Sequence, residues 1–284
     1  MESLLSLSFD YLSSNDGVKI RKGLRQLEGL LAQICLSRSP SAADRRSSLV
    51  PNSPTKQSQP PKELSLLKDD PAFREFFKLQ EGFEWNVAIR LISTLERLLS
   101  RSSTGQNDLL LVSTLDLLHG ILLIHPPSRA LFAREIYMNL LLDLLEPTNC
   151  PAIQSSALLT LVTSLLSTPQ NTRTFEAVDG LLAVTSLFKS RGTSREVKMK
   201  VVEFLYFYLM PEVPVAVNGN GNGNGFAGGL QRSPSKRLGS GGGGESGVTR
   251  STDEKQRLLG RHLNNVEDLV EDLRESAPFG ANLA

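Results

Sequence analysis

The residue types that most often carry catalysis are rare in this chain and lie far apart. Its three histidines are His119, His125 and His262. The first two fall on one predicted helix, where a turn of about 100° per residue sends them to roughly opposite sides. They are therefore poorly placed to share a metal ion, and we predict a packing or surface role for each histidine.

Motifs that would hold a cofactor or a metal are missing from the sequence. It contains no His-Glu-x-x-His pair, no paired Cys-x-x-Cys and no glycine-rich phosphate loop. The glycine-rich runs at 219–225 and 241–244 do not separate a strand from a helix, so they are interpreted as spacers. We therefore predict neither a cofactor nor a metal site.

The two cysteines give no better sign of catalysis. Cys35 and Cys150 are distant in sequence, as expected for ordinary thiols in a reducing compartment. A cysteine-dependent phosphatase would need an arginine six residues after its nucleophile, but Ser41 and Ser156 stand there. We predict a protein that is not an enzyme, while catalytic groups that converge from distant segments stay open as the alternative.

Two short motifs indicate modification. Ser53 and Ser233 each begin a Ser-Pro-x-Lys pattern, which is the preferred substrate pattern of cyclin-dependent kinases. A phosphate would add about −1.5 to −2 units of charge next to several basic residues. Ser53 and Ser233 are therefore candidate phosphorylation sites, with chance matches in low-complexity segments as the alternative.

Charge and hydropathy argue against nucleic acid and membrane partners. Thirty-one basic and 30 acidic side chains leave a net charge of +1. The basic residues around Arg45 and at Arg232–Arg237 are few and lack interleaved aromatics. The start, Met1–Leu4, has no basic signal-peptide region, and no apolar stretch approaches the roughly 20 residues of a membrane span. We expect a cytoplasmic protein.

A helical repeat accounts for most of the leucines. Between Asp108 and Pro211 the apolar pattern recurs at about 43 residues, a period typical of HEAT and armadillo repeats. The matched pairs are Leu118 and Leu161, Leu122 and Leu165, Pro126 and Pro169, Phe132 and Phe175, and Leu144 and Leu187. A weaker third copy follows Leu115, Leu158 and Val201. The predicted fold is an all-α armadillo/HEAT-like helical superhelix with disordered linkers, an architecture typical of adaptors.

Local signals place the individual helices. Asp70 and Pro71 predict an N-cap and a first helical turn, followed by one helix from Phe73 to Arg101 or two helices bent near Gly82. Ser128 and Ser194 are further N-cap candidates. The repeat helices are expected at Asp108–His125, Ser128–Glu146, Ala152–Ser167, Gln170–Ser190 and Ser194–Met210.

Composition divides the chain into ordered and disordered parts. The predicted parts are N-terminal helices at 1–36, a disordered Ser/Pro-rich insert at 37–66, helical repeats at 67–213, a Gly/Asn/Ser-rich linker at 214–250 and a C-terminal helix at 251–276. Ser251-Thr252-Asp253-Glu254 forms a capping-box pattern for that last helix. Its apolar stripe either folds back onto the end of the stack or binds a partner, a second copy of the chain included.

Two segments carry a family resemblance. They are Phe73–Ala88, with the sequence FREFFKLQEGFEWNVA, and His125–Asn139, with the sequence HPPSRALFAREIYMN. Both resemble the fungal family called cell division control protein 14, a septation initiation network component unrelated to the phosphatase of that name. The resemblance covers nearly all of the ordered chain up to about Pro211.

The resemblance implies a function that composition and periodicity do not show. It implies a non-catalytic partner of a germinal-centre (Ste20-like) protein kinase that acts at the spindle pole body to promote septum formation and cytokinesis. Candidate partner-binding residues in the two segments are Phe83, Trp85, Arg129, Arg134, Glu135 and Tyr137. Large aromatics such as Phe83 and Phe132 are equally natural in a core, which we favour for these two. Arg129, Arg134 and Glu135 either form a partner groove or tie adjacent helices together. A general adaptor with trafficking or cytoskeletal clients is the alternative function.

Overall fold

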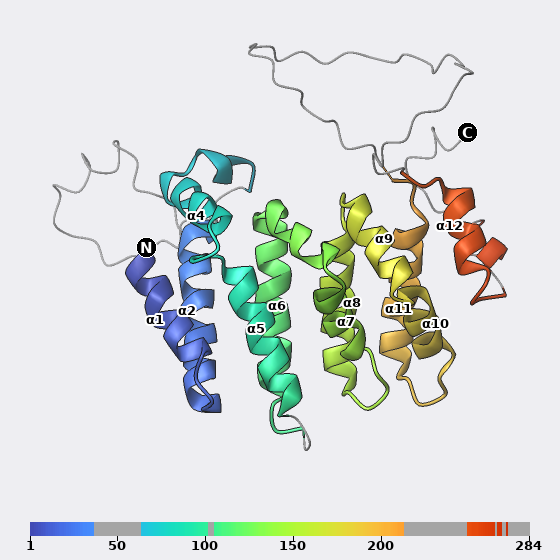
Figure 1. Ribbon diagram of the computed structural model, residues 1–284, viewed down its shortest axis with the longest axis horizontal. Helices are drawn as coiled ribbons and strands as arrows, with labels where there is room; N and C mark the ends of the chain where they lie inside the picture. Colours follow the sequence, from blue (N-terminus) through green and yellow to red (C-terminus); the bar gives the residue numbers. More distant parts are fainter. Residues whose placement is uncertain (37–63, 102–104, 213–248, 265, 269–270, 272–284) are drawn as a thin grey trace, which may run out of the picture. The chain divides into compact units, whose positions relative to one another are not determined.

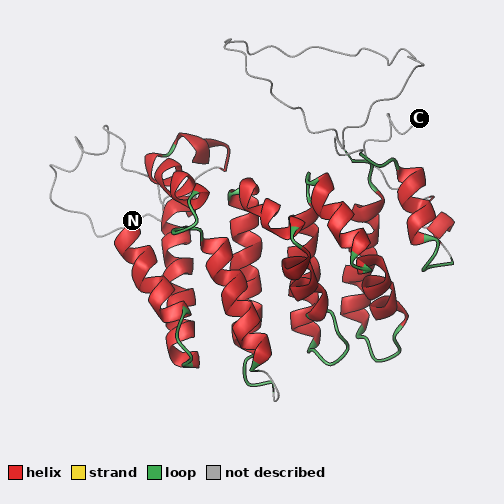
Figure 2. Ribbon diagram, in the orientation of Figure 1, coloured by secondary structure: helices red, strands yellow, loops and turns green. Residues whose placement is uncertain are grey.

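The computed structural model describes residues 1–36, 64–101, 105–212, 249–264, 266–268 and 271. Within these ranges every regular element is a helix, and Figure 2 shows only helices and loops. The predicted all-α fold is therefore confirmed. The candidate phosphorylation sites Ser53 and Ser233 lie outside the described residues, as do nearly all of the predicted insert and linker.

The helices follow one another with short connections. Their bounds are α1 Glu2–Leu12, α2 Gly17–Leu36, η1 Leu64–Asp69, α4 Pro71–Glu81, α5 Val87–Ser100, α6 Asp108–Ile124, η2 Pro126–Ala133, α7 Glu135–Asp143, α8 Pro151–Leu165, α9 Pro169–Ala177, α10 Gly180–Lys189, α11 Arg195–Leu209 and α12 Thr252–Leu259. The chain divides into two compact units, the first at Met1–Phe207 and the second at Tyr208–Ala284.

The first unit contains the sequence repeat as a structural repeat. Each copy consists of three helices, the first of which is short. The three copies are α4-α5-α6, η2-α7-α8 and α9-α10-α11. Pro126 and Pro169 begin the short helices η2 and α9, where a missing N–H costs nothing. The paired residues Phe132 and Phe175 are fully buried. The repeat predicted from the leucine spacing is thus confirmed.

Equivalent helices of neighbouring copies pack on one another. The third helices continue a row that begins with α2, so that α6 contacts α2 on one side and α8 on the other. The short helix η2 likewise contacts both α4 and α9. In Figure 1, α1 and α5 run down the page while α2, α6 and α8 run up it. Each helix therefore buries its leucines against its immediate neighbours, as expected of a solenoid.

Capping explains several of the boundaries. The Asp70 carboxylate accepts hydrogen bonds from the N–H groups of Ala72 and Phe73 at 2.8 and 3.1 Å, and Ser194 Oγ accepts one from Val197 N at 3.3 Å. The region after Asp70 forms two helices, α4 and α5, with the break after Gly82 that the sequence indicated. Ser128 is not an N-cap: the short helix already starts at Pro126, and Ser128 is buried inside it.

Two expected long helices are broken, so the single helices predicted at Ser128–Glu146 and Gln170–Ser190 are wrong. The first breaks at Arg134, whose backbone is extended with φ −87° and ψ 126°. The second breaks at Asp179, which adopts a left-handed conformation with φ 59°. Each break turns the chain from a short helix into the second helix of its repeat. Phe132 or Phe175 can then enter the core.

Within the second unit, α12 is bound to the segment that follows α11. Lys255 Nζ donates a hydrogen bond to Met210 O at 2.9 Å and lies 3.3 Å from Glu212 Oε1. The predicted capping box is present at Ser251 and Glu254. The predicted single helix to residue 276 is wrong, because α12 ends at Leu259 and Gly260 turns the chain.

Two neighbouring helices, α6 and η2, together reach the length and composition of a membrane span. A bend of 116° separates the two helices. None of the described helices alone is long and apolar enough to cross a bilayer.

Candidate protein-binding surface

The first corner of the repeat array lies between α4 and α5. Gln80 is fully buried and closes the loop from both sides: its Nε2 donates to Trp85 O at 3.0 Å, and its Oε1 accepts from Val87 N at 2.8 Å. Asn86 Oδ1 caps α5 by accepting from Ile89 N at 3.0 Å, while its Nδ2 donates to Gln80 O at 2.6 Å. These bonds fix the loop 82–86 as a rigid corner.

Of the two aromatic rings at this corner, one is exposed to solvent and the other is partly covered by α1. Phe83 is 74% exposed, so the expectation that it belongs to the core is wrong. The ring of Trp85 is partly covered, because it stacks on Phe9 of α1 with 6.4 Å between ring centroids. The loop geometry set by Gln80 and Asn86 holds Phe83 outside the core. A partner that covers the exposed Phe83 ring would gain about 1.5–3 kcal/mol of binding free energy from removing the ring from water.

The second corner lies between η2 and α7, in the next repeat. Arg134 and Glu135 are exposed, and Ile136 is 64% exposed. The Arg134 guanidinium carbon lies 5.9 Å from the centroid of the half-buried Tyr137 ring, within reach of a cation–π interaction. This corner therefore combines an apolar, a cationic and an aromatic group on one short segment.

The two corners belong to adjoining elements. Asn86 Nδ2 donates to Ser128 Oγ of η2 at 3.2 Å, and α4 packs on η2. We use the term corner surface for Phe83, Trp85, Arg134, Glu135, Ile136 and Tyr137. Five of these six were candidates from the sequence. Ile136 was missed, although it lies inside the family-like segment between Glu135 and Tyr137.

Arg129 does not belong to the corner surface. Its side chain is buried, with Nε donating to Leu122 O at 2.9 Å and Nη1 donating to Leu166 O at 3.0 Å. Those carbonyls lie at the ends of α6 and α8, so the guanidinium ties two consecutive third helices to η2. Burial lowers the pKa of Arg129. Of its two predicted roles, the geometry favours the tie between helices.

Buried amides also tie neighbouring elements together: Asn86 of the first copy binds Ser128 of η2, and Asn171 of the third copy makes a similar tie. Asn171 Nδ2 donates to Ser164 O at 2.6 Å and to Arg129 O at 2.7 Å, which joins α9 to η2. Ser128 occupies the equivalent place in η2 and contacts His125 Nδ1 at 2.8 Å. Sequence reasoning missed Asn171, although the alignment that pairs Phe132 with Phe175 also pairs Ser128 with Asn171.

The histidines of the first unit take part in packing contacts. His125 is buried, and its ring lies edge-on to Phe77 at 4.5 Å between centroids. His119 Nδ1 lies 2.7 Å from Thr163 Oγ1 of α8. Burial lowers the pKa of both histidines. Among the described residues, no three His, Cys, Asp or Glu side chains are close enough together to hold a metal ion.

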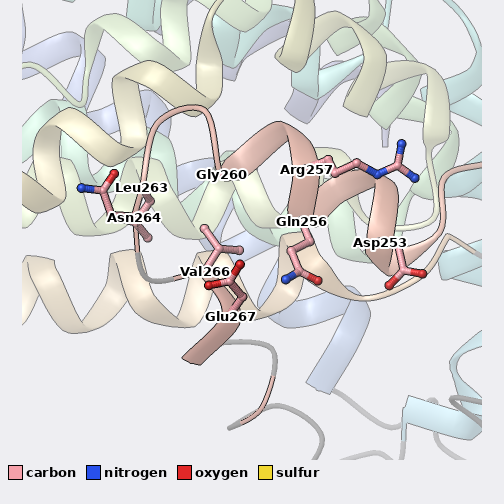
Figure 3. Close-up of a pocket in the computed structure, with 8 residues that line it drawn as sticks. All are labelled: Asp253, Gln256, Arg257, Gly260, Leu263, Asn264, Val266 and Glu267. Atoms are coloured by element: carbon pink, nitrogen blue, oxygen red, sulfur yellow. The ribbon is translucent and has the colours of Figure 1, made fainter.

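A cavity of about 540 Å³ lies in the second unit beside α12. Figure 3 shows that its charged side chains are spread along the walls, with Asp253 near the start of α12 and Glu267 beyond the turn at Gly260. Such a spread gives no nucleophile and base in contact with each other.

Comparison with protein families matches residues 1–279 to the family described as cell division control protein 14, SIN component. The chain belongs to this family. The curated cell division control protein 14 of Schizosaccharomyces pombe is 28% identical over 288 residues, which cover 99% of this chain and 97% of that protein. No solved structure matches the chain.

Membership in this family supports a role in septation initiation. The family is described as a component of the septation initiation network and not as a phosphatase. Both segments of the corner surface lie inside the matched range. The exposed residues of those segments are the natural place to look for the contacts that this role requires.

Proposed function

We propose that this family member is a non-catalytic partner of a germinal-centre (Ste20-like) protein kinase in septation initiation, recruited with that kinase to the spindle pole body. The single observation that supports the proposal most is Phe83, an aromatic side chain 74% exposed on a corner held by four hydrogen bonds of Gln80 and Asn86. A side chain that is already held in place loses little conformational entropy when a partner binds it. Large aromatic side chains are also frequent among the residues that dominate protein interfaces.

The second corner adds polar specificity to this apolar anchor. Ile136 extends the apolar area, while Arg134 and Glu135 present opposite charges beside it. Interfaces of this composition combine a desolvated centre with a polar rim. The kinase would bind across both corners, and the stacked helices beneath would hold them in place.

The test is a binding measurement with the purified kinase. Phe83→Ala and Ile136→Ala should each weaken binding about tenfold or more, because interface anchors are worth about 2 kcal/mol or more. Met199→Ala is the matched control, since Met199 is 56% exposed but lies on α11, away from both corners in sequence. It should change the affinity less than about twofold.

Thermal melts of the variants establish that each remains folded. Failure of the intact protein to bind any germinal-centre kinase from the same organism would overturn the proposal. Unchanged affinity in both corner variants would leave a kinase partner but remove the corner surface as its site. Recruitment is tested separately by imaging the tagged variants at spindle poles.

A further inference from the structure

A second surface lies between α2 and α6, which pack side by side in the first unit. It encloses a cavity of about 590 Å³ whose lining is shared by the two helices. We call it the α2–α6 groove; its walls are formed by Arg21, Leu24, Arg25, Glu28, Leu109, Leu110, Ser113, Asp116 and Leu117. None of these residues belongs to the corner surface.

The floor of the groove is apolar and its rim is exposed. Leu24 and Leu110 are only 3% and 4% exposed and close the bottom. Leu109, in contrast, is 74% exposed on the α6 side. A partner that covers this leucine would gain about 1.5–3 kcal/mol of binding free energy. The groove can therefore accept an apolar side chain beside Leu109.

The α2 wall of the groove carries two arginines and one glutamate. Arg21 and Arg25 lie one helical turn apart, both are exposed, and neither forms an ion pair with any described residue. Lys19 and Lys22 extend the positive charge along the same stretch of α2. Lys22 is held over the Tyr11 ring, 4.6 Å from its centroid. The cations in the lining of the groove are Arg21 and Arg25.

The two carboxylates of the groove, Glu28 and Asp116, form no ion pair with its two arginines. Asp116 Oδ1 accepts a hydrogen bond from Ser156 Oγ of α8 at 3.2 Å, which directs it toward the neighbouring helix. Glu28 lines the far end and makes no ion pair with the described arginines. Two free guanidinium groups beside an apolar floor are complementary to carboxylates that flank an apolar side chain.

We propose that the α2–α6 groove binds an acidic peptide segment of a partner protein. Carboxylates of that segment pair with Arg21 and Arg25, and an apolar side chain of the segment covers Leu109. This surface acts independently of the corner surface, so the proposal does not depend on a kinase bound there. The groove lacks aromatic side chains on which bases could stack, which favours a peptide over a nucleic acid.

The test uses a fluorescent peptide of sequence EELEDLEE and its neutral counterpart QQLQNLQQ, with binding followed by anisotropy on the full chain. The acidic peptide should bind saturably, and its affinity should fall between about 50 and 300 mM NaCl because the pairs are solvent-exposed. The double variant Arg21→Gln/Arg25→Gln should weaken binding about tenfold or more, and Leu109→Ser should weaken it at both salt concentrations.

The control is Arg191→Gln/Arg195→Gln, which removes the same charge from two exposed arginines of equal spacing near the start of α11. It should change the affinity less than about twofold. No saturable binding to the wild-type protein below about 1 mM, equal losses in the two double variants, or equal binding of the neutral peptide would each overturn the proposal.

Discussion

The side chain of Arg129 shows how one residue can hold three elements. It is buried in η2 and donates to the carbonyls of Leu122 and Leu166, at the ends of α6 and α8. Its own carbonyl accepts from Asn171 of α9. Buried carbonyl groups at helix ends need donors, and the guanidinium supplies two in a fixed geometry.

Replacing Arg129 should therefore destabilise the fold. Hydrogen bonds to charged groups contribute about 1.5–3 kcal/mol. Truncation removes the buried donor to Leu122 O and leaves Leu166 O with the Thr168 hydroxyl as its side-chain donor. We expect Arg129→Ala to lower the free energy of unfolding by about 2–4 kcal/mol in urea titrations. The control Arg134→Ala, at an exposed position, should change it by less than about 0.5 kcal/mol. Equal effects of the two changes would contradict the tie between helices.

His125 gives the fold a pH dependence. Burial lowers its pKa below the ordinary value of 6.5, and the nearby Glu81 carboxylate offsets this only in part. The unfolded chain then binds a proton more readily than the folded chain, so stability is complete above about pH 6.5 and falls as the pH drops through the folded pKa. His119 shifts in the same direction.

The melting temperature should accordingly decrease when the pH is lowered from about 7.5 to about 5.5. In His125→Asn this fall should be smaller, since one of the two histidines with lowered pKa is gone. Calorimetry at matched ionic strength measures both. A variant whose melting temperature falls as steeply as that of the wild type would show that His125 does not carry the effect.

At the scale of elements, the breaks between short and second helices decide the architecture. Asp179 turns the chain in a left-handed conformation, and Gly180 then passes close to Phe175. A Cβ added at Gly180 would lie 2.6 Å from the carbonyl oxygen of Phe175, and closer still to its ring. Only glycine allows this approach.

Two glycine substitutions should consequently act in opposite directions. Gly180→Ala forces Phe175 to move and should cost about 1–3 kcal/mol. Gly29→Ala in α2 should add about 0.5–1 kcal/mol, because no described atom lies within 4 Å of its added Cβ and alanine favours the helix. Urea unfolding of both variants checks the pair, and a stabilising Gly180→Ala would refute the close packing.

Sequence patterns predicted the third helices well and the corners poorly. Leu118, Leu122 and Leu161 recur at helical spacing, so their helix and their burial follow from periodicity alone. Arg134 carries no proline or glycine signal, so nothing local indicates its extended backbone. The exposure of Phe83 depends on hydrogen bonds between Gln80 and the loop that follows it, which a periodic pattern does not contain.

On the scale of the whole molecule, the first unit is held together by neighbouring helices. The main contacts of α6 are with α5, α8, α2 and η2, and those of α1 are with α2 and α5. Folding free energy in such stacks is roughly a sum over adjacent layers. A substitution that destabilises one layer should therefore have little effect on the stability of distant layers.

Gly23→Ala tests this locality. Its Cβ would lie 3.0 Å from Ser8 O and from Tyr11 Cβ, which wedges α1 away from α2. Hydrogen exchange should quicken about 5- to 150-fold in α1 and α2, the equivalent of 1–3 kcal/mol, and change little in α8 and α10. A uniform increase across Met1–Phe207 would indicate instead that the unit unfolds as one cooperative block.

Packing between adjacent layers also has a mechanical consequence. An extension applied between α1 and α10 is divided among the successive interfaces, as an extension is divided among springs in series. Each interface then has to rotate only slightly, and none has to rupture. Small rotations at successive interfaces therefore add up along the stack.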